Sequence, residues 1–331
     1  MKNKQKHQAR FYSQESGERV VCHLCPHNCT IAEGKAGICG VRRNQGGELF
    51  TENYGQLTSA GFDPIEKKPL YHFHPASSIL SLGTFGCNFS CGFCQNWRLS
   101  QGRPDTEYMS PDQVVQLARE RKSPGIAYTY SEPSVWYEFV SDTARLAHRQ
   151  GLDNVLVTNG YLEREPLLEL LPWIDAANVD LKSFNDKFYT EQCGGSLEPV
   201  LHNLELMQRE LHLELTTLII PGYNDSQTEL EQLFSWIADL DSAIPLHISR
   251  YFPNYKFDDP PTPLSTMREA YQLAGDYLDY VYLGNTNLDL GQDTFCPKCG
   301  KRVIKRNFYN TRNLLKEGDC PECGYHILDH Y

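Results

Sequence analysis

The sequence predicts an α/β fold in which six strand–helix units close into a barrel or partial barrel between two small cysteine-rich modules. Two observations carry this prediction. Apolar, strand-like runs alternate with helix-like stretches from about residue 77 onward. All of the 12 cysteines except Cys193 fall into three tight groups, one before this region, one near its start and one after it. Successive strand–helix units favour parallel strands with right-handed crossovers. A doubly wound open sheet is the alternative, and either fold places chemistry at the carboxyl ends of the strands.

The alternating elements can be assigned in chain order. The expected strands are 78–84, 125–129, 154–158, 176–181, 213–220 and 244–251, with a further short strand at 280–283. The first expected helix begins at Ser110, which suits the N-cap, followed by Pro111 at the first helical position. The second expected helix begins after Pro133, and the others span residues 166–171, 197–211, 225–240 and 267–278. Six units are fewer than the eight of a complete barrel.

Changes in composition suggest three domains. Residues 1–75 are rich in Gly, Cys, His and turn residues, which predicts an N-terminal Cys-rich metal-binding domain. Residues 76–291 hold the strand–helix units of the expected barrel, and residues 292–331 are expected to form a zinc-ribbon module. Because short spacings between cysteines recur in a large chain, metal or cluster ligation is favoured over a disulfide scaffold.

Charge and hydropathy narrow the function classes. The formal net charge of −11 argues against a nucleic-acid surface as the main activity. No run of about 18 apolar residues exists, so we expect no membrane span. The basic start, which includes Lys2, Lys4 and Arg10, has no apolar stretch behind it and is expected to be a short solvated tail rather than a signal peptide. The expected compartment is the cytoplasm.

The central cysteines, Cys87, Cys91 and Cys94, have the spacing C-x3-C-x2-C directly after the first expected strand. A structural zinc site and a [4Fe–4S] cluster each normally use four protein ligands. Three thiolates would leave one iron of such a cluster open to chelate a small molecule, S-adenosylmethionine (SAM). A zinc site completed by a distant residue, or an electron-transfer cluster with four ligands, are the alternatives. The aromatic Phe93 and the preceding strand argue against both.

This motif resembles the signature of the radical SAM superfamily. The longer stretch 81–97 is similar to the branch related to pyruvate formate-lyase activating enzyme, and residues 63–75 resemble the AmmeMemoRadiSam-system radical SAM proteins. The resemblance extends from about Cys22 to Cys323 and implies a partial (β/α)6 TIM-type barrel. It implies an oxidoreductase in which a [4Fe–4S] cluster reductively cleaves SAM to a 5′-deoxyadenosyl radical that abstracts hydrogen from an unidentified substrate.

The resemblance also implies residues that bind SAM. Tyr130, Ser131 and Glu132 end the second expected strand, where the superfamily has a Gly-Gly-Glu-Pro segment that binds the SAM amino group. Here Tyr130 and Ser131 replace the glycines, and Glu132 would accept from the ammonium. The alternative is that Glu132 merely starts a helix. Asn159 ends the third strand and would contact the ribose or methionine part, with a simple Asn-Gly turn as the alternative.

The later strands carry further candidates. Asp180 and Lys182 resemble an Asp-x-Lys segment of the activating-enzyme branch, and they would contact SAM or substrate or form a structural ion pair. His247 would contact SAM or be a buried, satisfied histidine. Arg250, at the end of the sixth strand, would contact a carboxylate substrate. Cys193 is expected to be a free buried thiol.

The N-terminal cysteines, Cys22, Cys25, Cys29 and Cys39, supply four thiolates, enough to close a site. Zinc and a second [4Fe–4S] cluster both fit this count, with zinc slightly favoured. His23 and His27 are spare ligand candidates.

The C-terminal cysteines, Cys296, Cys299, Cys320 and Cys323, have zinc-ribbon spacing, and each pair forms a Cys-Pro-x-Cys-Gly knuckle. Zinc would fold a module too small for a core of its own, and a rubredoxin-like iron site is the alternative. Basic residues between the knuckles suggest a role in partner docking or as a lid.

Two other functions remain open. One is glycyl-radical-enzyme activation of the pyruvate formate-lyase activating type, and the other is a metal-binding adaptor without turnover. The expected partners are a flavodoxin or ferredoxin electron donor and a small-molecule or protein substrate, with no membrane and no nucleic acid.

Overall fold

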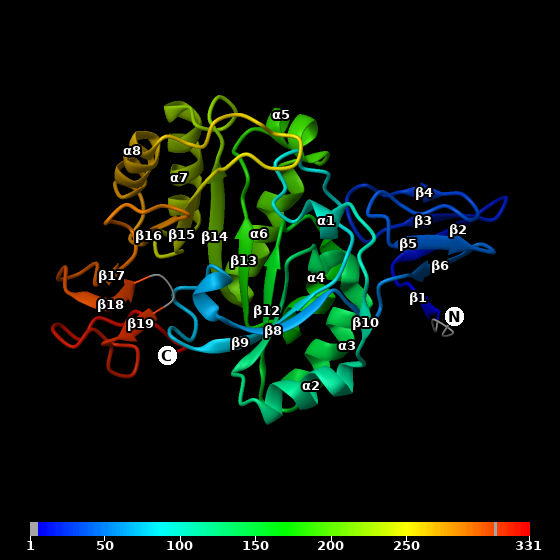
Figure 1. The fold of residues 1–331 in the computed structure, drawn as a ribbon, viewed down its shortest axis with the longest axis horizontal. Coiled ribbons are helices and arrows are strands. Elements are labelled where there is room, and N and C mark those ends of the chain that lie inside the picture. Colours follow the sequence, from blue (N-terminus) through cyan, green and yellow to red (C-terminus); the bar gives the residue numbers. More distant parts are fainter. Residues whose placement is uncertain (1–5, 308–309) are drawn as a thin grey trace.

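The computed structural model describes residues 6–307 and 310–331, so Lys2 and Lys4 of the basic start lie outside the described residues. Its centre is one eight-stranded sheet, ordered β16-β15-β14-β13-β12-β11-β9-β8, with helices outside it (Figure 1). All neighbours pair in parallel except β8 and β9, which are antiparallel. The strands are β8 (Ser59–Pro64), β9 (Ser78–Gly83), β11 (Gly125–Thr129), β12 (Asp153–Thr158), β13 (Ala176–Asp180), β14 (His212–Ile219), β15 (Leu246–Arg250) and β16 (Val281–Gly284).

This arrangement is the predicted α/β partial barrel. The central strands are buried on both faces, as parallel strands covered by helices are. The helices are α1 (Trp97–Ser100), α2 (Pro111–Glu120), α3 (Tyr137–His148), α4 (Arg164–Leu170), α5 (Asp186–Phe188), α6 (Glu198–Glu210), α7 (Gln227–Asp241) and α8 (Leu264–Ala274). Short 3-10 turns cover η1 (Ile65–Lys67), η2 (Pro133–Trp136) and η3 (Leu171–Trp173), and a π-helical turn, η4, covers Tyr189–Cys193.

Local sequence accounts for the helix starts. Ser110 caps α2 through its hydroxyl, which accepts from the Gln113 N–H, while the Gln113 side chain accepts from the Ser110 N–H. Pro133 starts a 3-10 turn, and the α-helix begins only at Tyr137. The short strand expected at 280–283 is β16, which pairs in parallel with β15 and makes a seventh parallel strand.

The segment before the barrel is richer in strands than its weak periodicity indicated. It contains β1 (His7–Gln8), β2 (Tyr12–Glu15), β3 (Arg19–Cys22), β4 (Thr30–Ile31), β5 (Arg42–Gln45), β6 (Glu48–Thr51) and β7 (Gln56–Leu57), and β7 pairs with β10 (Glu107–Tyr108). Strands β1–β6 form two small three-stranded sheets. The expectation of a solvated tail fails at Arg10, which forms an ion pair with Glu169 and donates its N–H to Glu138 at 2.8 Å.

The C-terminal module is a three-stranded sheet of β17 (Thr294–Phe295), β18 (Arg302–Asn307) and β19 (Asn310–Asn313). It lies on the opposite side of the barrel from β1–β6 (Figure 1). Arg306, buried in β18, donates to the Tyr71 carbonyl at 2.7 Å. The His74 N–H donates to the His330 carbonyl at 3.1 Å, and the His74 ring contacts Asp153 at the amino end of β12. The module therefore docks at the amino ends of the strands, a placement that does not favour the lid role; partner docking, the other expected role, stays a prediction.

Among the described residues, no helix is both long enough and apolar enough to cross a membrane.

Candidate functional site

A cavity of about 320 Å³ opens at the carboxyl ends of the parallel strands. It collects most of the candidate residues from distant parts of the chain. The residues predicted from the sequence that line this cavity are Cys87, Cys91, Phe93, Cys94, Tyr130, Ser131, Glu132, Asn159, Asp180 and Lys182. The cavity thus lies at the end of the barrel where chemistry is expected.

The loop between β9 and α1 presents the three central cysteines, and main-chain contacts hold it. Gly86 has φ +94°, a conformation that favours glycine. After it, the Ser90 N–H donates to the Cys193 carbonyl at 2.8 Å, and the Gly92 N–H donates to the Gln192 carbonyl at 3.2 Å. These main-chain hydrogen bonds hold the loop against η4.

The three thiols fit a cluster better than a single ion. Within the described ranges 6–307 and 310–331, Cys87, Cys91 and Cys94 do not form a set whose sulfurs all lie within 4.8 Å of one another. Ligands of one ion must lie closer than that, whereas a cube of irons spreads its thiolates over separate corners. Burial raises the pKa of the Cys87 and Cys94 thiols, so bound iron would have to displace their protons.

Glu132 is buried and already accepts several hydrogen bonds. Its carboxylate accepts from the Ser134 N–H at 3.0 Å, from the Thr158 hydroxyl at 2.5 Å and from the Asn159 N–H at 2.9 Å. Burial raises its pKa, and these donors offset part of that effect. The contact with Ser134 makes Glu132 the N-cap of η2, so the helix-start interpretation describes one of its roles.

Tyr130 and Ser131 occupy the strand end in place of glycines. Tyr130 has φ +69°, and its hydroxyl donates to Asp63 while Lys68 donates to it at 3.2 Å. The Ser131 hydroxyl is buried and has no hydrogen-bond partner among the described residues. A cavity-lining hydroxyl without a partner is available to a ligand.

Asn159 links the third strand to the cysteine loop. Its side-chain Nδ2 donates to Asn88 Oδ1 at 2.8 Å and to the Cys87 sulfur at 3.8 Å. Its own side-chain oxygen accepts from the Tyr161 N–H at 2.9 Å. The amide is therefore fixed beside a candidate ligand.

Asp180 and Lys182 form an ion pair with 3.0 Å between Lys182 Nζ and Asp180 Oδ2 at the cavity wall. Burial lowers the pKa of Lys182, but the Asp180 carboxylate and nearby thiols outweigh it and leave that pKa well above the usual value. Lys182 therefore brings a positive charge to the side of Cys91.

His247 and Arg250 lie outside the cavity lining. His247 is buried, and its Nε2 lies 2.6 Å from Glu214 Oε2, so it matches the satisfied-histidine interpretation. Arg250 donates from Nε to the Thr262 carbonyl at 2.7 Å. Since side chains alternate along a strand and Ser249 lines the cavity, Arg250 faces the other side of β15. The carboxylate contact expected of Arg250 is not supported by this placement.

Several lining residues were absent from the sequence prediction. They are Lys67, Gln95, Asn96, Ser100, Thr129, Val157, Thr158, Thr216, Leu218, Ser249 and Asn285, with Phe89 from the cysteine loop. The signal that identifies many of them is a small polar residue at a strand's carboxyl end on the cavity face. Phe93 packs between Phe188 and Phe257, with 5.7 Å between ring centroids in each pair.

Cys193 is fully buried, as expected of a structural thiol, and its main-chain carbonyl accepts from the Ser90 N–H next to Cys91. The Cys193 thiol outweighs burial and lowers the pKa of Cys91, while burial and the Cys91 thiol raise the pKa of Cys193. A buried cysteine distant in sequence therefore adjoins the candidate cluster loop.

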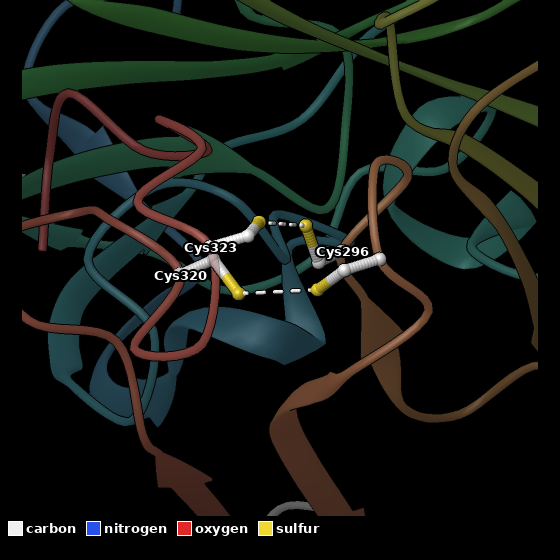
Figure 2. Close-up of side chains that lie close together, drawn as sticks. Cys296, Cys320 and Cys323 are labelled. Carbon is white, nitrogen blue, oxygen red and sulfur yellow. Dashed lines mark hydrogen bonds between the residues drawn. The ribbon is translucent and has the colours of Figure 1, made fainter.

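The C-terminal cysteines form a compact site. The four sulfurs all lie within 4.8 Å of one another, and those of Cys296 and Cys323 are 3.6 Å apart, as are those of Cys299 and Cys320 (Figure 2). Such spacing fits one tetrahedral metal ion. The two knuckles fold alike, with Gly300 donating to Cys296 and Gly324 donating to Cys320 through the main chain.

Comparison with known proteins agrees with this geometry. The model of the Radical SAM superfamily matches residues 81–234. The uncharacterized protein MJ0808 of Methanocaldococcus jannaschii is 43% identical over 330 residues, which cover 97% of this chain and 98% of that protein. The pyruvate formate-lyase 1-activating enzyme of Escherichia coli K12 is 26% identical over 174 residues, 50% of this chain and 71% of the enzyme.

Solved structures share the fold. Streptococcus suis SuiB bound to S-adenosylmethionine aligns with a TM-score of 0.51 at 14% identity, covering 63% of this chain and 52% of SuiB. SuiB bound to the precursor peptide SuiA gives the same TM-score and covers 67% of this chain.

Proposed function

The chain belongs to the radical SAM superfamily, and from that membership we propose that the cavity at the strand ends binds a [4Fe–4S] cluster through Cys87, Cys91 and Cys94 together with SAM. When bound, these groups supply reductive cleavage of SAM to methionine and a 5′-deoxyadenosyl radical that abstracts hydrogen from a substrate. The observation that carries the proposal is the gathering of three separated thiols and a row of polar strand ends around one cavity.

The chain's own residues would bind and orient the two groups. Glu132 has carboxylate capacity left after its three protein donors and would accept from the SAM ammonium. The unpartnered Ser131 hydroxyl would bond another polar atom of SAM. Asn159 would donate toward the Cys87 sulfur, and Lys182 would balance negative charge near Cys91.

We propose that the enzyme belongs to the AmmeMemoRadiSam branch. The segment that resembles this branch, residues 63–75, reaches the cavity in the structure, because Lys67 lines it and Asp63 accepts from the Tyr130 hydroxyl. Glycyl-radical-enzyme activation is the second candidate, favoured by the similarity to the pyruvate formate-lyase activating enzyme over half of this chain.

Further proposals concern partners and metals. A reduced flavodoxin or ferredoxin would deliver the electron, and a small molecule or a protein side chain would be the substrate. Zinc is the proposed ion for the C-terminal cysteines. We also propose a cytoplasmic location, because none of the 12 cysteines, all of which lie in the described residues, forms a disulfide, as is typical of a reducing compartment.

The test is reductive cleavage of SAM by anaerobically purified protein. With dithionite and SAM, wild type is expected to release 5′-deoxyadenosine, while Cys87→Ala, which lacks one proposed iron ligand, releases none above background. Absence of 5′-deoxyadenosine from protein with a full iron content would reject the enzyme and favour the adaptor. Incubation with a glycyl-radical enzyme, followed by electron paramagnetic resonance (EPR), decides whether the activase alternative holds.

A further inference from the structure

The N-terminal cysteines surround a small cavity of their own. Cys22 ends β3, Cys25 and Cys29 lie in the following loop, and Cys39 lies before β5. The cavity is lined by these four cysteines together with Leu24, His27, Ile31, Gly37, Arg42 and Val135. The four thiols therefore converge on one place, although the sequence did not decide between zinc and a cluster.

The spacing of the sulfurs distinguishes the two. A tetrahedral zinc ion with Zn–S bonds of ~2.3 Å holds its sulfurs ~3.8 Å apart. The C-terminal cysteines show this spacing, with 3.6 Å between paired sulfurs. Within residues 6–307 and 310–331, no three of the N-terminal thiols have their sulfurs all within 4.8 Å of one another. The same holds for Cys87, Cys91 and Cys94, the proposed cluster ligands. The N-terminal group therefore resembles the cluster loop and differs from the zinc-type site.

The spare histidines differ in their contacts. Both ring nitrogens of His23 have partners, Ser13 Oγ at 2.8 Å and Asn28 Oδ1 at 3.2 Å. His27 lines the cavity and bonds the Asn88 carbonyl through Nε2 at 2.7 Å, but among the described residues it forms no set with two of these thiols in which all ligand atoms lie within 4.8 Å. The site offers four thiolates, which is the ligand set of a [4Fe–4S] cube.

Arg42 supplies a second, independent observation. Its side chain is 1% exposed and lines the cavity, and its Nε–H has no hydrogen-bond partner among the described residues. The guanidinium is otherwise held by Glu138, 2.9 Å from Nη1, and by the Arg10 carbonyl. A buried donor without an acceptor is costly, so it points to an acceptor within the cavity. Sulfides and thiolates of a cluster are acceptors whose hydrogen bonds tune its potential.

We propose that Cys22, Cys25, Cys29 and Cys39 hold a second [4Fe–4S] cluster, with Arg42 Nε donating to one of its sulfurs. The slight preference for zinc drawn from the sequence is thereby reversed. The site lies directly behind the SAM-cluster loop, since a Cβ on Gly86 would lie 2.9 Å from the Cys39 carbonyl oxygen. A one-electron centre would thus stand beside the loop that carries Cys87.

Metal analysis of anaerobically purified variants tests the assignment without any activity assay. In the Cys87→Ala/Cys91→Ala/Cys94→Ala variant, we expect about four irons and four sulfides per chain to remain, with about one zinc. An EPR signal of a reduced [4Fe–4S] cluster is expected from the same sample. About two zinc ions and no iron would overturn the proposal. The result does not depend on SAM cleavage, so it is separable from failure of the proposed function.

Two further variants complete the test. Cys25→Ala/Cys29→Ala should lose about four irons relative to wild type and keep its zinc, whereas Cys296→Ala/Cys299→Ala should lose its zinc and keep all iron. If removal of the N-terminal thiols impairs folding, Arg42→Lys keeps the charge opposite Glu138 and all four thiols but removes the Nε donor. It should lower the midpoint potential of the N-terminal cluster alone. An unchanged potential would overturn the role of Arg42.

Discussion

The side-chain amide of Asn159 lies 3.8 Å from the sulfur of Cys87 and is fixed there by a 2.8 Å hydrogen bond to Asn88. Donors to ligand sulfurs raise the reduction potential of a cluster, and loss of such a supporting contact typically costs 10–100-fold in activity. Asn159→Leu keeps the volume and removes the donor. We expect a lower midpoint potential and about tenfold slower formation of 5′-deoxyadenosine, equivalent to about 1.4 kcal/mol.

Asn203 offers a matched control. It is buried in α6 and donates to the Gly160 carbonyl at 2.9 Å and the Leu162 carbonyl at 2.7 Å, so it supports the same loop without approaching a thiol. Asn203→Leu should reduce stability and leave the potential unchanged. Equal shifts of potential in both variants would contradict a direct effect of Asn159 on the cluster.

Cys193 adjoins the cysteine loop through its carbonyl, which accepts from the Ser90 N–H, yet we expect different consequences from removal of Cys91 and of Cys193. Cys91→Ala deletes a proposed iron ligand and should abolish the SAM-dependent change in the EPR signal of the reduced cluster. Cys193→Ala removes a buried sulfur from η4 and should cost about 1 kcal/mol of unfolding free energy, with iron content unchanged. Loss of the SAM-responsive cluster in Cys193→Ala would instead make Cys193 a ligand.

The sequence predicts a strand where its apolar residues record burial, and it does not predict a strand that depends on pairing with a neighbour. The parallel strands were predicted because long apolar runs record burial on both faces, as in β11 and β13. Strand β8, with Gly61 and Pro64, lacks that signal, because its strand conformation comes from antiparallel pairing with β9. Such pairing is a tertiary effect that local composition does not record.

The site shows a similar limit. The cysteine loop, Glu132, Asn159 and Lys182 reach one cavity because each follows the carboxyl end of a neighbouring parallel strand. Arg250 does not line the cavity, because neighbouring side chains on a strand point to opposite faces and Ser249 lies on the cavity face of β15. The proposal of a cluster instead of zinc at the N-terminal cysteines rests on how closely the sulfurs approach one another, which sequence spacing leaves open.

Glu214 is a buried carboxylate at the base of the barrel. It accepts from the main-chain N–H groups of Tyr71 at 2.9 Å and His72 at 2.7 Å, and from His212 at 3.0 Å and His247 at 2.6 Å. Burial opposes its ionisation, but the hydrogen bonds from His212 and His247 outweigh burial and hold the pKa of Glu214 below its usual value. The stabilisation by Glu214 is therefore fully present above the ordinary carboxyl pKa of ~4.3 and is lost as the pH falls below it.

Glu214→Gln should lower the free energy of unfolding at pH 7 by about 3 kcal/mol. The difference in the free energy of unfolding between Glu214→Gln and wild type should become smaller below pH ~4.3, by up to about 1.4 kcal/mol per pH unit. Denaturant unfolding at a series of pH values measures both effects. The partly exposed Glu169, paired with Arg10 and Arg145, is the control, and Glu169→Gln should cost at most about 1 kcal/mol at pH 7. A difference for Glu214→Gln that grows toward acid pH would refute this account.

Gly86 connects the two proposed cluster sites, and its substitution should affect both. Its φ is +94°, and a Cβ there would lie 2.5 Å from Val41 Cγ1 and 2.9 Å from the Cys39 carbonyl oxygen. A carbonyl oxygen of the main chain cannot yield as a flexible side chain can, so Gly86→Ala must displace either the loop of Cys87 or the segment of Cys39. We expect a loss of more than about 1 kcal/mol of stability, because strain at positive φ adds to the clash.

Gly61 in β8 is the matched substitution, since a Cβ there has open space and its φ is not in the left-handed region. Gly61→Ala should leave iron content and stability unchanged or raise stability by a few tenths of a kcal/mol. Iron content, sulfide content and thermal unfolding of Gly86→Ala and Gly61→Ala measure both effects. Because Gly86 packs against the Cys39 segment and precedes Cys87, Gly86→Ala should reduce the iron content at both sites. A Gly86→Ala variant that retains full iron and wild-type stability would show that the two loops are not packed as described.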